Sequence, residues 1–170
     1  ILSMLSTACA NMDNLEMTPL YSQATVNEIN SVYVASIDGQ DGVYLHNILQ
    51  AGIDTTNNPK YRLQADISYT EKNLAIGNDS SITRKKIDVN VDFVLVDITG
   101  SGEVLTSFST IGFANYSSSG TSYLTEVSKK DAVRRALSIA GQSAILRLSY
   151  IFENGILTKW KYNLTRLMII

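Results

Sequence analysis

Alternation of apolar and polar side chains predicts three long β-strands in the middle of the chain. In residues 61–70, starting at Tyr61, apolar or aromatic residues occupy every second position. The same period of two runs through residues 87–95, and a third strand is predicted for residues 103–116. A period of two gives each strand one buried and one hydrated face. We therefore expect a sheet that is open to water on one side.

Helical spacing of apolar residues predicts two helices around these strands. A first strand is predicted at residues 31–37, and Asp41 in the following turn is a candidate N-cap. Apolar residues then repeat at helical spacing as far as Gly52. A longer apolar stripe runs over residues 122–150 and predicts the last helix.

Two glycines lie inside predicted elements. Gly112 interrupts the third long strand, where a glycine is typical of a bulge or bend. Gly141 lies inside the last helix, where it costs about 1 kcal/mol relative to alanine. We interpret Gly141 as a sign that the helix packs closely against the sheet.

The chain contains a single cysteine, Cys9, which follows eight apolar and small residues. This arrangement is typical of the end of a bacterial signal peptide whose cleavage leaves a cysteine for lipidation. Leu5 lies one position earlier than the usual leucine, with Ser6 in its place, so a structural thiol is the alternative. A single cysteine cannot form an internal disulfide. Attached acyl chains would anchor the protein to a membrane.

These patterns predict an α+β fold with the order β-α-β-β-β-α. It consists of a mixed four-stranded sheet with two helices packed on one face. Residues 1–8 are interpreted as the end of a lipoprotein signal peptide, and residues 9–30 as a polar, lipidated N-terminal tether. Residues 31–150 form the predicted domain, and residues 151–170 form a C-terminal tail.

Composition and motifs argue against several classes of function. A net charge of −2 gives no reason to expect nucleic-acid binding. No apolar run approaches the ~20 residues of a membrane-spanning helix. His46 is the only histidine and has no second ligand at metal spacing. The sequence has no phosphate-binding glycine loop or nucleophile elbow. We expect a protein that is not an enzyme and that carries no metal or cofactor.

The order of several short motifs carries a family resemblance. They are Cys9, Pro19-Leu20-Tyr21, Tyr61-x-Leu63, Thr83-Arg84 and Asp131-Ala132-x-x-Arg135-Ala136. In this order, over roughly residues 9–150, the chain resembles the lipopolysaccharide-assembly lipoprotein family (LptE, also called RlpB), in its alphaproteobacterial variant. The resemblance implies an outer-membrane lipoprotein, anchored on the periplasmic side, that plugs the barrel protein LptD. It also implies help in barrel assembly and contact with lipopolysaccharide in transit.

Two groups of cations are candidate ligands for the phosphates of lipopolysaccharide. Arg84, Lys85 and Lys86 are consecutive and lie near a predicted hairpin. Lys129 and Lys130 lie at the start of the last helix, where a cation opposes the helix dipole. Such side chains bind phosphate through charge-assisted hydrogen bonds. Ordinary solvated surface charge is the alternative for both groups.

A second function remains open at this point. The alternative is an envelope lipoprotein whose small α+β domain binds another ligand or serves a different envelope complex. Polar rows such as the one at residues 88–92 suit the hydrated lumen of a barrel. Any half-exposed sheet has rows of this kind. Residues 159–170 are basic, aromatic and apolar, and would either contact a membrane interface or partner or have no function.

Overall fold

The computed structural model describes residues 22–76, 82–100, 102–118 and 121–154. Its elements, in chain order, are α1 (Gln23–Ile29), β1 (Val32–Val34), α2 (Gly39–Gly52), β2 (Tyr61–Ile76), β3 (Ile82–Asp97), β4 (Val104–Ser117) and α3 (Ser122–Glu153). The lipidation predicted at Cys9 lies outside the described residues. So do the predicted contacts of residues 159–170.

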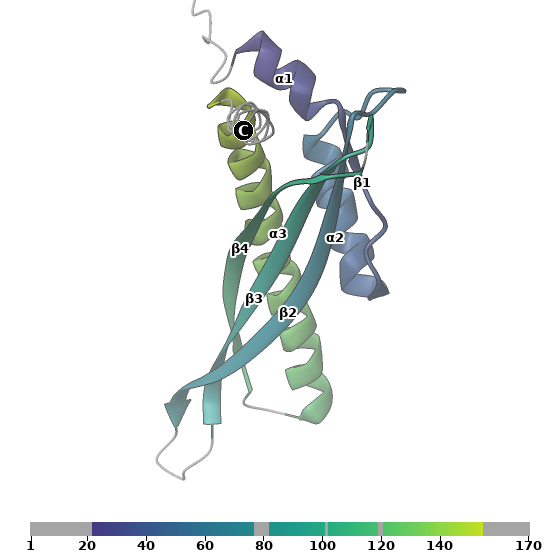
Figure 1. The fold of residues 1–170 in the computed structure, drawn as a ribbon. Coiled ribbons are helices and arrows are strands. Elements are labelled where there is room, and N and C mark those ends of the chain that lie inside the picture. Colours follow the sequence, from purple (N-terminus) through teal and green to yellow (C-terminus); the bar gives the residue numbers. More distant parts are fainter. Residues whose placement is uncertain (1–21, 77–81, 101, 119–120, 155–170) are drawn as a thin grey trace, which may run out of the picture.

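The strands form one mixed sheet in the order β1-β2-β3-β4 (Figure 1). β1 pairs in parallel with the start of β2, and α2 makes the crossover between them. The β2–β3 and β3–β4 pairs are antiparallel. Helices α2 and α3 cover one face of the sheet. The predicted α+β class and the order β-α-β-β-β-α are therefore confirmed, with the additional helix α1 in front.

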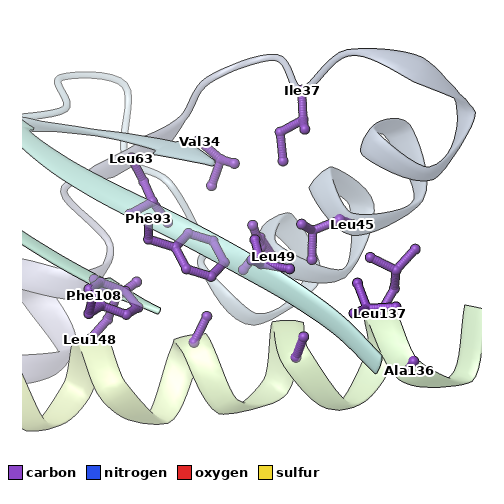
Figure 2. Packing of buried hydrophobic residues seen from close by; sticks show 14 of the residues in the cluster. Val34, Ile37, Leu45, Leu49, Leu63, Phe93, Phe108, Ala136, Leu137 and Leu148 are labelled. Carbon is purple, nitrogen blue, oxygen red and sulfur yellow. The ribbon is translucent and has the colours of Figure 1, made fainter. Parts of the chain in front are cut away.

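The core lies between this face of the sheet and the two helices (Figure 2). Phe93 on β3 and Phe108 on β4 stack with their ring centroids 5.1 Å apart and their planes 20° apart. Leu45 and Leu49 of α2 and Leu137 of α3 are fully buried in the same core. Burying such side chains contributes roughly 1.5–3 kcal/mol each. The alternation seen in the sequence thus corresponds to real burial.

Helix α1 lies within residues 10–30, which the sequence predicts to be polar and irregular as part of the tether. The Ser22 side chain caps it by accepting a hydrogen bond from the Thr25 amide. Its Glu28 carboxylate accepts from the Tyr61 hydroxyl at 2.9 Å and pairs with Lys60, also at 2.9 Å. Glu153, at the end of α3, accepts from the Ser22 hydroxyl at 3.1 Å. The irregular interpretation was wrong for this helix because tertiary contacts hold a segment with weak helical periodicity.

The N-cap of α2 is Asp38, so the interpretation of Asp41 as the cap was wrong. Asp41 lies in the first turn of the helix, and its carboxylate accepts a hydrogen bond from the Tyr69 hydroxyl. Gly39 adopts a φ of 83°, a conformation that glycine reaches at no steric cost. The chain therefore turns into the helix three residues earlier than predicted.

Both interior glycines allow close packing. Gly112 pairs regularly with Val89, so the predicted bulge was wrong. A Cβ on Gly112 would instead meet the backbone of α3. Gly141 does mark close packing, but a Cβ there would meet Ile48 of α2 at 2.8 Å rather than the sheet. In the same way, a Cβ on Gly52 of α2 would meet the side chain of Ile145 of α3. Small residues thus let α3 approach both β4 and α2.

Candidate functional site

The predicted cations gather at one end of the molecule, which we call the basic tip. It is defined by Lys72, Arg84, Lys85, Lys86, Lys129 and Lys130. Here β2 and β3 extend beyond α2, and the start of α3 lies beside the sheet (Figure 1). The antiparallel β2–β3 pairing opposes Lys72 to Lys86. The structure therefore brings both predicted groups of cations to the same end of the sheet.

Strand alternation divides the three consecutive cations between the two faces of the sheet. Lys85 is in phase with the buried Ile87 and faces the helices. Arg84 and Lys86 are on the open face, and Arg84 is exposed. The three side chains therefore do not form one compact cluster, and each face of the tip has its own cations.

On the helical face, Glu71 holds cations from two elements. Its carboxylate lies 2.7 Å from the Lys85 Nζ and 2.9 Å from the Lys129 Nζ. Hydrogen bonds from Lys85, then Lys129, then Tyr116 lower the pKa of Glu71 to about 2. Burial and the bond to Glu71 raise the pKa of the Tyr116 hydroxyl. Glu71 therefore remains ionised at neutral pH and joins β2, β3 and α3.

On the open face, Asp88 holds a second pair of lysines. Lys86 Nζ lies 2.7 Å from one carboxylate oxygen, and Lys72 Nζ lies 3.2 Å from the other. The hydrogen bond from Lys86 is the main cause of the lowered pKa of Asp88. Lys86 also lies over the ring of Phe113, 4.6 Å from its centroid, in a cation–π contact. Arg84 forms no ion pair with another described residue.

A hollow of about 580 Å³ lies on the helical face between the first turn of α2 and residues 126–133 of α3. Its charged and polar lining includes Asp38, Asp41, Tyr69, Glu71, Lys129 and Lys130. The Tyr69 hydroxyl donates to Asp41 at 2.8 Å across the hollow. Because it lies next to the core but is lined by charge, the hollow suits a polar or ionic group better than an apolar one.

Sequence reasoning missed Glu71 and Tyr116, although the sequence contains a signal for the first. Glu71 is in phase with Tyr61 and Tyr69 on the face that is buried further along β2. Lys85 breaks the apolar phase of β3 in the same way. A charge at a core position indicates a charged partner on the same face. The identity of that partner required the β2–β3 register.

The described residues hold no group of three or more histidine, cysteine, aspartate or glutamate side chains that could bind a metal ion. None of α1, α2 and α3 has the combination of length and hydropathy that a membrane-spanning helix needs.

Comparison with protein families decides the identity of the fold. Residues 29–148 match the model of LptE, described as lipopolysaccharide-assembly. The chain belongs to the LptE family. The match runs from the end of α1 almost to the end of α3 and includes the whole sheet. The family recognised from the order of short motifs is thus confirmed.

Two solved structures share the LptE-like fold of this chain. A candidate lipoprotein from Caulobacter crescentus CB15 is 21% identical, with a TM-score of 0.60 over 75% of this chain and 95% of that one. Lipoprotein B from Nitrosomonas europaea is 12% identical, with a TM-score of 0.50 over 75% of this chain and 86% of that one. No curated protein matches the chain.

Family membership also settles the broad functional class. LptE proteins assist lipopolysaccharide assembly and are not enzymes. They belong to the envelope machinery that transports lipopolysaccharide. The sequence-based expectation of a non-enzymatic assembly protein therefore agrees with the family to which the chain belongs.

Proposed function

We propose that this chain is an outer-membrane lipoprotein that associates with the barrel protein LptD, plugs the barrel and assists its assembly. The observation that carries the proposal is the LptE match across residues 29–148, which covers the complete sheet and its two covering helices. The membrane anchor is a lipid on Cys9. The segment from Cys9 to Ser22 can reach at most roughly 45 Å. That length keeps the domain close to the periplasmic side of the outer membrane.

The open face of the sheet supports the role of a plug. It carries polar rows on β2 and β3, and the hydroxyl of Ser109 on β4 donates to Asp92 at 2.5 Å. On the same face, Asn90 donates to Asp92 at 3.2 Å. The interior of an outer-membrane barrel is polar and hydrated. A hydrogen-bonded polar face can therefore lie against that interior without burying unpaired groups.

The basic tip supplies the contact with lipopolysaccharide in this proposal. Arg84 and Lys86 present cations on the open face, and Lys129 and Lys130 present cations at the hollow. A phosphate would compete with Glu71 for Lys85 and Lys129. The competition exchanges one charge-assisted pair for another, so we expect modest affinity that weakens with salt.

Co-purification tests the association with the barrel. Tagged protein, solubilised from outer membranes, should bring down a large barrel protein of the LptD kind. Mass spectrometry of the mature N-terminus should find acyl groups on Cys9. Recovery of only soluble or peptidoglycan-linked partners would contradict the proposal and favour a different envelope complex.

A charge variant tests the ligand contact. Replacing Arg84, Lys85 and Lys86 together by serine should lower the affinity of the folded protein for lipopolysaccharide in a low-salt binding assay. The control replaces Lys60, which precedes β2, and Arg62, which lies at the start of β2, by serine. If the triple variant keeps an intact circular dichroism spectrum and an unchanged affinity, the basic tip does not bind lipopolysaccharide. An equal loss of affinity in the control would show that overall charge, and not the basic tip, determines binding.

A further inference from the structure

Near the basic tip, the open face of the sheet carries two apolar side chains next to polar ones. Gly112 of β4 faces the helices, so Ile111 and Phe113 on either side of it face the opposite way. Their side chains are 62% and 55% exposed. They end two cross-strand rows that are otherwise polar, Ser68–Asn90–Ile111 and Thr70–Asp88–Phe113. Exposed apolar side chains that adjoin one another and are rimmed by polar residues are typical of an interaction site. We call Ile111 and Phe113 the apolar pair.

Cations border the apolar pair on the side of the basic tip. Lys86 Nζ lies 4.6 Å from the centroid of the Phe113 ring. Arg84, two residues further toward the tip on the same face, is exposed and forms no ion pair with another described residue. Lys72 lies opposite Lys86 on β2. Asp88 holds both lysines, so three cations surround one carboxylate and Arg84 stays available to an anion.

We infer that this surface binds an acylated phosphate, with the phosphate at Arg84 and Lys86 and an acyl chain across the apolar pair. The inference rests on the proposed contact with lipopolysaccharide and assigns a second part of that ligand, its acyl chain, to side chains of β4. Guanidinium and ammonium groups bind phosphate oxygens through charge-assisted hydrogen bonds. An acyl chain on the apolar pair removes apolar surface of both partners from water.

The cations and the apolar pair lie close enough for one ligand to contact both. Residues two apart on one face of a strand are separated by about 7 Å. Arg84 is therefore one such step from Lys86, and Lys86 is in direct contact with the Phe113 ring on the neighbouring strand. A phosphate and the acyl chain of the same glycolipid can reach these groups at the same time.

Three simpler occupants each explain only part of this surface. The lumen of a barrel is polar and hydrated, so contact with the lumen gives no reason for an exposed Ile111 and Phe113. A phosphate without an acyl chain needs the cations only. A neutral hydrocarbon chain needs the apolar pair only and gains nothing from the Arg84 guanidinium. An anion that carries an acyl chain uses both features.

Intact and fully deacylated lipopolysaccharide test the inference. The protein is the full chain carrying Cys9→Ser, so that no acyl group is attached to it, and calorimetry at low salt measures the affinity for each form. Replacing Ile111 and Phe113 together by serine should lower the affinity for the intact form roughly tenfold. The affinity of this variant for the deacylated form should be unchanged. Replacing the same two residues by leucine should retain the affinity for the intact form, because an apolar surface remains.

The matched control replaces Val43 of α2 and Leu146 of α3 by serine. These apolar side chains are 58% and 57% exposed, and their helices cover the other face of the sheet (Figure 1). The control should bind both forms of lipopolysaccharide as the parent does, and every variant should keep the circular dichroism spectrum of the parent. The inference is overturned if the serine pair binds the intact form like the parent, if it loses affinity for both forms equally, or if the control loses as much.

Arg84→Ser separates this inference from the proposed function. It should lower the affinity for both forms of lipopolysaccharide, because both carry the phosphates. If Arg84→Ser weakens binding and the serine pair does not, the contact with lipopolysaccharide stands and the acyl site is wrong. If the parent binds neither form, both are wrong. Co-purification with the barrel depends on neither result.

Discussion

Gly112 on β4 lies directly against the carbonyl oxygen of Ala136 on α3. A Cβ at Gly112 would lie far inside van der Waals distance of that oxygen. The neighbouring Thr110 donates its hydroxyl to the carbonyl of Ala140 at 3.0 Å in a buried hydrogen bond. Backbone contact at Gly112 and a hydrogen bond at Thr110 therefore set the distance between the helix and the sheet.

Gly112→Ala should destabilise the protein. The methyl group must push α3 away from β4, and overpacking of this kind costs about 3 kcal/mol. Chemical denaturation followed by circular dichroism measures the loss. Gly100→Ala is the control, because no atom lies within 4 Å of a Cβ at that position, and it should leave the free energy of unfolding nearly unchanged. Equal stability of the two variants would contradict the close approach.

Glu71 should make stability depend on acid pH. Its folded pKa of about 2 lies below the ordinary value of 4.5. Its contribution is therefore complete above about pH 4.5 and is lost as the pH falls toward 2. Glu71→Gln should lower the free energy of unfolding by about 1 kcal/mol at neutral pH, after allowance for solvent screening. The difference from the parent should disappear near pH 2.

Denaturation of both proteins across this pH range checks the prediction for Glu71. Glu103→Gln, an exposed carboxylate near the start of β4, serves as the control and should follow the parent at every pH. A constant gap between Glu71→Gln and the parent from neutral pH to pH 2 would show that the ion pairs are not its cause.

Glu153→Gln should release α1 from the end of α3. The Glu153 carboxylate accepts hydrogen bonds from the Thr25 and Ser22 side chains, and these bonds lower its pKa. A neutral amide accepts more weakly than a carboxylate. Amide hydrogen exchange should become faster in residues 23–29 and remain unchanged in α2. Acidification of the parent should have the same effect, but only below the ordinary range of a glutamate, because the lowered pKa keeps the Glu153 carboxylate ionised through that range.

Glu126→Gln, near the other end of α3, is the control for Glu153→Gln and should leave the exchange of α1 unchanged. If Glu153→Gln leaves α1 as protected as in the parent, the carboxylate does not hold the helix in place. The contacts of Glu28 with Tyr61 and Lys60 would then be the interactions that hold α1.

Phe93→Ala should be among the most damaging single changes in the core. Phe93 is 1% exposed at the centre of β3 and stacks on Phe108. Loss of a buried phenylalanine costs about 3–5 kcal/mol. Phe113→Ala is a control of the same residue type, since Phe113 is 55% exposed, and it should cost about 1 kcal/mol or less. Thermal and chemical unfolding of both variants distinguish a buried ring from an exposed one.

Most of the fold could be predicted because its signals are local. The phase of Tyr61 to Tyr69 and of residues 87–95 identified the buried face of β2 and β3 before any contact was known. Helix α1 escaped prediction because its seven residues carry too few apolar positions for a period. Its stability comes from Glu28 and Glu153, whose partners are distant in the sequence.

The site could be predicted only in part. The cations Lys85 and Lys129 were identified by type, and the structure brings both to Glu71. The sequence could not show that Arg84 and Lys85 lie on opposite faces in contact with different partners. Nor could it pair Lys86 with Asp88 and Phe113, since the β3–β4 register determines which residue lies beside the lysine.

By itself, the sequence determined the order of strands and helices and their buried faces, because the periods of 2 and 3.6 are properties of neighbouring residues. Tertiary structure alone decided that Glu71 joins Lys85 and Lys129, because that contact depends on the pairing of strands and the position of a helix. It also decided that Gly112 and Gly141 are places of close approach to α3 and α2. A glycine has the same local pattern in a bulge as in a close contact, and only the partner element distinguishes the two.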